Sequence, residues 1–182
     1  MSVIKRREEI IQSPIRIGFC GSMGSGKTYA SNELRNSVSD AKVLSISTPI
    51  KQIVLNMGKE GRASHIMVGM CGRHIDEDVW VKKVMKSIDE TPILCPIIVD
   101  DIRFENEAVA LKNAGFTLVY LNTPWAVRFK RILTRSSDLN EHVQWFGHES
   151  EVAPENIDKK HFDYICTNEE DVKSVIDTIV NW

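Results

Sequence analysis

The feature that most constrains the fold is the glycine-rich segment at residues 21–28, GSMGSGKT, which follows the pattern GxxxxGK[ST]. An apolar run at residues 15–20 precedes it, and a helical pattern from about residue 27 to residue 36 follows it. Glycines let the backbone turn tightly and aim N–H groups at an anion, and a helix N-terminus adds partial positive charge. Together, the strand, loop and helix predict a phosphate-binding turn. The alternative is a chance glycine turn, which has no reason to lie between a strand and a helix.

The ligand expected in this loop is ATP with Mg²⁺. The Lys27 ammonium can reach the β- and γ-phosphates, and the Thr28 hydroxyl can ligate the metal. The candidate nucleotide-binding residues are Gly21, Ser22, Met23, Gly24, Ser25, Gly26, Lys27, Thr28 and Tyr29.

Short apolar runs alternate with helical patterns along the rest of the chain. Strands are predicted at residues 42–46, 97–101, 117–121 and 162–166, and helices from residue 48, at 76–88, at 105–114, from 123 to about 134, and after Asn168. Such alternation predicts an α/β domain with a parallel sheet and helices on both faces. Residues 58–76, which are glycine-rich, and residues 136–158, which are polar, interrupt the rhythm and are expected to form substrate loops or a lid.

Composition excludes several classes of function. With 182 residues and a formal net charge of −2, the chain suits one domain without the basic field that nucleic acid or an anionic membrane would require. Its four cysteines lack the CxxC spacing of a zinc cluster. Neither a signal peptide nor a membrane-spanning stretch is apparent, so we expect a cytoplasmic enzyme with small-molecule partners. Self-association as a homodimer is left open.

An acid and a base lie at the end of the third predicted strand, where residues 99–103 read VDDIR. Side chains two residues apart in a strand share a face, so Asp101 and Arg103 should project together while Asp100 points away. Ligands of open parallel sheets bind beyond the carboxyl ends of the strands. Asp101 is therefore expected to hold the magnesium hydration shell and Arg103 to clamp a phosphate. An ordinary surface ion pair is the alternative.

A row of arginines follows the fourth strand. Arg128, Arg131 and Arg135 fall at i, i+3 and i+7 of a predicted helix and so share one face. Cations over a moving γ-phosphate are what phosphoryl transfer needs, so this face predicts a lid, with Arg131 and Arg135 ranked above Arg128. A solvated basic face is the alternative.

Four blocks of sequence resemble the phage-type deoxynucleoside monophosphate kinases of the P-loop nucleoside monophosphate kinase superfamily. They are the phosphate loop at residues 18–28, TPIK at 48–51, a block running from Arg62 through Gly72-Arg73 to Trp80, and DIRFENE at 101–107. A weaker fifth match is HESE at 148–151, whose His148 and Glu151 receive no role. The departures at His65, Ile66 and Met70 lie in the acceptor region, so the resemblance leaves the base unspecified.

The resemblance implies a single three-layer P-loop kinase domain over residues 1–182, with a five-stranded parallel sheet in the order 2-3-1-4-5. An acceptor-binding insert would occupy about residues 48–88 and a lid about residues 128–151. By likeness, Arg73 and Arg103 would hold the acceptor phosphate, Lys51 would contact the acceptor, and Trp80 would line or support its pocket. The implied source is a phage, which would place the enzyme in the host cytoplasm.

The implied reaction is ATP-dependent phosphoryl transfer to a deoxynucleoside 5′-monophosphate, giving the diphosphate and ADP. The acceptor's own phosphate is the nucleophile, so alignment and charge neutralisation take the place of a strong base. The expected catalytic residues are Lys27, Asp101, Arg103, Arg131 and Arg135. Two alternatives stay open: a P-loop kinase for a non-nucleotide phosphorylated metabolite, and a nucleotide-binding switch, for which the sequence lacks the guanine motif [N/T]KxD.

Overall fold

A parallel sheet of five strands forms the centre of the part of the chain that the structure, a computed structural model, describes: residues 14–135, 145 and 147–181. Its order is β2-β3-β1-β4-β5, and every neighbouring pair is parallel. The strands are β1 (Arg16–Cys20), β2 (Lys42–Leu44), β3 (Ile97–Ile102), β4 (Thr117–Leu121) and β5 (Tyr164–Cys166). The α/β class and the strand order implied by the resemblance are thereby confirmed.

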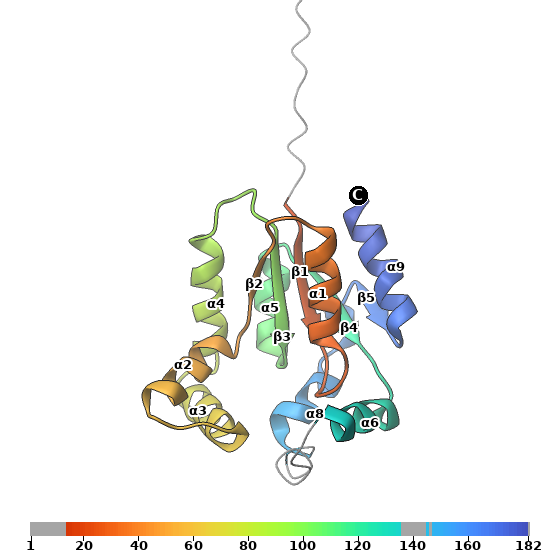
Figure 1. Cartoon of the computed structure of the whole chain (residues 1–182). Helices are drawn as coiled ribbons and strands as arrows, with labels where there is room; N and C mark the ends of the chain where they lie inside the picture. The colour runs from red at the N-terminus through yellow and green to blue at the C-terminus, as the bar shows by residue number, and fades with distance from the viewer. Residues whose placement is uncertain (1–13, 136–144, 146, 182) are drawn as a thin grey trace, which may run out of the picture.

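Helices cover both faces of this sheet (Figure 1). On one face lie α1 (Lys27–Ser37) and α9 (Glu169–Val180), and on the other α4 (Val79–Asp89) and α5 (Glu105–Asn113). Strand β4 shows why the strands read as continuous apolar runs. Its Leu118 and Tyr120 pack into the core with α4 and α5, whereas Val119 and Leu121 pack into the core with α1 and α9.

The remaining helices gather at the carboxyl end of the sheet, at the bottom of Figure 1. They are α2 (Thr48–Asn56), α3 (Arg62–Ile75), α6 (Trp125–Arg135) and α8 (Glu149–Asn156), with a short 3₁₀ turn, η1 (Lys159–His161), before β5. These helices stand where ligands of parallel sheets bind. None of the described helices has both the length and the apolar character needed to cross a bilayer.

Helix α3 corrects one expectation from the sequence. Residues 58–76 were predicted to be an irregular substrate loop, because glycine lowers helix propensity. The structure forms a helix of 14 residues there, and two of its glycines lie at close contacts. A Cβ on Gly69 would lie 3.4 Å from Ile50 Cδ1, and one on Gly72 would lie 2.2 Å from Trp80 Cζ2. Tertiary packing therefore overrides local propensity in this segment.

Trp80 joins α4 to α3. Its indole is only 4% exposed and belongs to the core cluster on the α4–α5 face of the sheet. Its Nε1 donates a hydrogen bond of 2.9 Å to the Gly69 carbonyl oxygen, and its ring lies against Gly72. The structure therefore places Trp80 beneath α3, as a support for that helix, and not among the side chains that line the cavity described below.

We predict that Gly72→Ala destabilises the protein, because the added methyl group would overlap the Trp80 ring. Overpacking of this kind costs about 1–3 kcal/mol. The measurement is the free energy of unfolding in urea. Cys71→Ala, on the exposed side of the same helix, is the matched control and should change it by less than about 0.5 kcal/mol. Equal stability of the two variants would contradict the close contact.

Candidate active site

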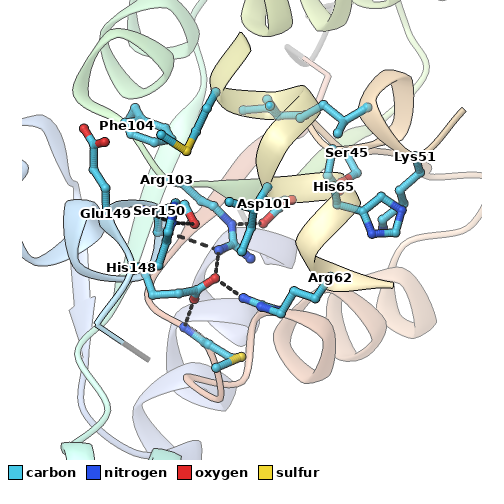
Figure 2. Close-up of a pocket in the computed structure, with 18 of the residues that line it drawn as sticks. Ser45, Lys51, Arg62, His65, Asp101, Arg103, Phe104, His148, Glu149 and Ser150 are labelled. Atoms are coloured by element: carbon cyan, nitrogen blue, oxygen red, sulfur yellow. Dashed lines mark hydrogen bonds and ion pairs between the residues drawn. The ribbon is translucent and has the colours of Figure 1, made fainter. Parts of the chain in front are cut away.

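A cavity of about 1150 Å³ opens at the carboxyl end of the sheet. The phosphate loop, the β2–α2 turn, α3, the end of β3 and the start of α8 line it, and Figure 2 shows part of this lining. The sequence-predicted residues that it brings together are Met23, Gly24, Gly26, Lys27, Thr28, Tyr29, Lys51, Arg73, Asp101 and Arg103. Segments more than 100 residues apart in sequence therefore meet at one site.

The phosphate loop has the backbone that its glycines predict. Gly24 (φ 77°) and Gly26 (φ 103°) both have positive φ angles, which residues with a Cβ rarely adopt. A Cβ on Gly24 would also approach the Arg128 carbonyl oxygen to 2.8 Å. Gly26 immediately precedes α1, so the loop delivers the unpaired N–H groups of a helix N-terminus to the cavity.

Lys27 folds back across this loop. Its ammonium donates hydrogen bonds to the carbonyl oxygens of Gly21 and Ser22, the latter at 3.1 Å. Burial and, secondarily, the nearby Arg103 guanidinium lower the Lys27 pKa to about 8. An anion in the loop would favour the charged form of this side chain.

Asp101 and Arg103 project together from the end of β3, as their spacing predicts. Arg103 Nε donates to Asp101 Oδ1 at 2.8 Å. Burial tends to raise the pKa of Asp101, but Arg103 and Lys27 outweigh it and hold this pKa at about 2. Asp101 is therefore ionised at neutral pH. Asp100 also borders the cavity, although strand alternation predicted that it points away.

Arg73 is held by a buried acid and an aromatic ring. Its Nη2 lies 3.1 Å from Glu107 Oε1, and its guanidinium carbon lies 4.0 Å from the Phe104 ring centroid. Glu107 is 1% exposed and also accepts hydrogen bonds from the backbone N–H groups of Arg103 and Phe104. Burial raises the Glu107 pKa. These contacts fix the strand-to-helix turn after β3 and hold Arg73 at the cavity wall.

Glu151 is the central acid of the site, and sequence reasoning gave it no role. Its side chain, on α8, is buried, and its Oε2 accepts a hydrogen bond of 3.0 Å from the Met23 backbone N–H. Its Oε1 accepts hydrogen bonds from both Arg62 and Arg103. His148 caps the same helix, because its Nδ1 accepts from the Ser150 backbone N–H at 3.2 Å. The HESE match at residues 148–151 was the one sequence signal for this acid.

The predicted arginine row is only partly a lid face. Arg128 is buried, and its Nη2 lies 2.7 Å from Glu155 Oε1. Arg131 donates to the carbonyl oxygens of Gly24 and Ser25 in the phosphate loop and pairs with Glu169 at 2.9 Å. Arg135 ends α6, and its side chain lies outside the described residues, as do residues 136–144 and 146 of the predicted lid.

A family model described as an AAA domain matches residues 17–158, which is most of the chain. The chain belongs to this AAA domain family. No curated protein matches it. The match runs from the first strand, through the phosphate loop and Arg103, to the helix that carries Glu151. All the residues that line the cavity therefore lie within the matched segment.

Solved structures share the fold of this AAA domain at low sequence identity. TT1252 from Thermus thermophilus is 15% identical, with a TM-score of 0.64 over 93% of this chain and 98% of that one. A shikimate kinase from Acinetobacter baumannii, in complex with shikimate, is 14% identical, with a TM-score of 0.57 over 92% of both chains. The Deinococcus radiodurans tunicamycin resistance protein is 20% identical, with a TM-score of 0.56 over 93% of this chain and 95% of that one. The AAA domain thus has a P-loop kinase fold.

The residues of the AAA domain fit Mg²⁺ delivered with a nucleotide. This ion prefers oxygen ligands and usually takes one or two from the protein and the rest from phosphates and water. The Thr28 hydroxyl and the ionised Asp101 carboxylate both line the cavity. Among the described residues, no three His, Cys, Asp or Glu side chains gather as a metal site.

We predict that ATP affinity falls as the pH rises above about 8. The Lys27 pKa is lowered to about 8 in the ligand-free protein, so above that pH nucleotide binding must take up a proton. The loss can reach about tenfold per pH unit up to the ordinary lysine pKa. The measurement is the dissociation constant for Mg-ATP, by calorimetry, from pH 7 to pH 10. Lys27→Arg stays charged and should give a flat profile; parallel slopes for the two proteins would contradict the assignment.

Proposed function

We propose that this AAA domain is a kinase that transfers the γ-phosphoryl group of ATP to a deoxynucleoside 5′-monophosphate, giving the diphosphate and ADP. The observation that carries the proposal is the composition of the cavity. A phosphate loop with Lys27 forms one side, and the guanidinium groups of Arg73 and Arg103 form another. A triphosphate and an anionic acceptor can therefore face each other in one cavity.

The donor side rests on the phosphate loop. Its N–H groups and Lys27 would bind the β- and γ-phosphates, and Thr28 and Asp101 would hold the magnesium ion directly or through water. The metal, when bound, neutralises charge on the phosphate oxygens. Arg131 already lies against the loop at Gly24 and Ser25, so a modest movement of its guanidinium would bring it to the nucleotide.

The acceptor side rests on Arg73 and Arg103. Glu107 and Asp101 hold these guanidinium groups at the cavity wall, so little side-chain entropy remains to be lost when a phosphate binds. Lys51 and residues of α3, including Ile66 and Met70, line the adjoining part of the cavity and would contact the nucleoside. The volume of about 1150 Å³ exceeds that of a typical site for one small ligand, which supports two substrates bound together.

A second acceptor class has its own support. Guanidinium groups bind a carboxylate as well as a phosphate, and one structure that shares this fold is a shikimate kinase in complex with shikimate. A panel of acceptors separates the two proposals: four deoxynucleoside monophosphates, their ribose counterparts and small hydroxy acids, read by ADP release. Turnover of hydroxy acids without turnover of nucleotides would overturn the primary proposal.

We also place the enzyme in the cytoplasm. The four cysteines are all among the described residues and all unpaired, which fits a reducing compartment.

Lys27→Ala is expected to lower kcat by about 10²–10³-fold, as the loss of a preorganised cation at the transferred group usually does. The fold should survive, because the hydrogen bonds that Lys27 Nζ donates in the described part of the chain are to Gly21 and Ser22 of its own loop. Steady-state ADP release measures the activity, and circular dichroism checks the fold. Wild-type turnover in a folded variant would remove the central assignment.

Arg73→Ala is expected to raise KM for the acceptor by about tenfold or more, because a charge-assisted contact contributes about 1.5–3 kcal/mol. The dissociation constant for Mg-ATP should stay within about twofold, since the contacts of the Arg73 side chain are with Gly69, Glu107 and Phe104. Arg73→Lys keeps the charge beside Glu107 but loses the planar fork, so its KM should lie between those of Arg73→Ala and wild type. A change in ATP affinity alone would contradict the acceptor role.

A further inference from the structure

Three donors converge on the carboxylate of Glu151. They are the Met23 N–H of the phosphate loop, Arg62 from α3 and Arg103 from the end of β3. Arg103 also donates to the Ser150 carbonyl oxygen at 3.2 Å. In Figure 2, the side chains of Arg62 and Arg103 approach the same carboxylate oxygen from two different elements. Two guanidinium groups and a backbone N–H around one anion form an arrangement that also suits a phosphate.

The position of this carboxylate is the second observation. Met23 belongs to the loop that would bind the triphosphate, and Arg103 is a candidate clamp for the acceptor phosphate. Glu151 contacts both and therefore lies between the donor and acceptor halves of the proposed site. Any phosphate that reached Arg62, Arg103 and the Met23 N–H together would compete with Glu151 for the same N–H groups.

Glu151 belongs to α8, a helix of eight residues that contacts the phosphate loop at more than one point. One turn later on the same helix, Glu155 accepts hydrogen bonds from Ser22 Oγ at 3.2 Å and from Arg128. At the other end, Lys159 Nζ donates to three carbonyl oxygens, those of Pro154, Glu155 and Ile157. Helix α8 thus directs two carboxylates at the loop, and its C-terminal turn is fixed by Lys159.

The charges around Arg103 show what Glu151 contributes. Burial tends to lower the Arg103 pKa, but the Asp101 and Glu151 carboxylates outweigh it and raise this pKa above its ordinary value. Without an anion between them, the partly buried Arg62 and Arg103 guanidinium groups would repel each other. Glu151 keeps both directed at one point in the absence of substrate.

We propose that Glu151 is a positioning residue that holds the place of a substrate phosphate in the ligand-free protein and is displaced when that phosphate binds. The identity of the substrate rests on the proposed function, but competition between Glu151 and a phosphate does not. The proposal therefore fixes the direction of the change in phosphate affinity: removing the Glu151 charge strengthens phosphate binding. A glutamate that only builds the site would have the opposite effect, because its loss would disorder the arginines.

The test compares the binding of inorganic phosphate to wild type and Glu151→Gln, by calorimetry with Mg-ADP present to fill the phosphate loop. Glutamine keeps the shape and a carbonyl acceptor but not the charge, so we expect phosphate to bind about threefold or more tightly, a change worth about 0.7 kcal/mol. Glu155→Gln removes the same charge one turn away and is the matched control, expected to change phosphate affinity by less than about twofold. Weaker or unchanged phosphate binding in folded Glu151→Gln would overturn the inference.

Glu151→Asp provides a second measurement if the glutamine variant does not fold. Aspartate keeps the charge but is one methylene shorter, so it should compete less well than glutamate, and phosphate binding should again be tighter than in wild type. Weaker binding would overturn the inference here too. The acceptor panel tests the proposed function separately. Tighter phosphate binding without nucleotide turnover would leave the role of Glu151 standing while the kinase assignment fails.

Discussion

Paired burial of acids and arginines at the carboxyl end of the sheet is the interaction on which the rest of the site depends. Asp101 pairs with Arg103, Glu107 with Arg73, and Glu151 with Arg62 and Arg103. Removing one partner of a buried pair leaves an uncompensated charge, at a cost of about 3–5 kcal/mol. These pairs therefore connect α3, α5, α8 and the end of β3. The carboxylates also offset the repulsion among the arginine side chains that they hold at one cavity.

The sequence predicted most of the fold because its signals were local. The phosphate loop lies between an apolar run and a helix, and the other buried strands are short apolar runs whose residues contact helices on both faces. The pairing of Asp101 with Arg103 followed from strand alternation for the same reason. The strand order came from the family resemblance, because periodicity carries no information about which strands are neighbours.

The parts that could not be predicted depend on contacts distant in sequence. Helix α3 was expected to be a loop because its segment is glycine-rich, and only contacts distant in sequence, of Gly69 with Ile50 and of Gly72 with Trp80, explain these glycines. Glu151 meets Met23 across 128 residues, and no local pattern distinguishes such an acid from a solvated one. Asp100 borders the cavity together with Asp101, which strand alternation alone did not predict.

The anchoring of α3 by Trp80 bears on how the protein can move. The indole is part of the core beside the sheet. Its hydrogen bond to Gly69 and its packing against Gly72 hold α3 to that core. A hinge movement of α3 would have to break the hydrogen bond from Trp80 to the Gly69 carbonyl oxygen and the packing of the Trp80 ring against Gly72. The α3 wall is therefore the fixed part of the cavity lining, because moving it would also disturb the core beside the sheet.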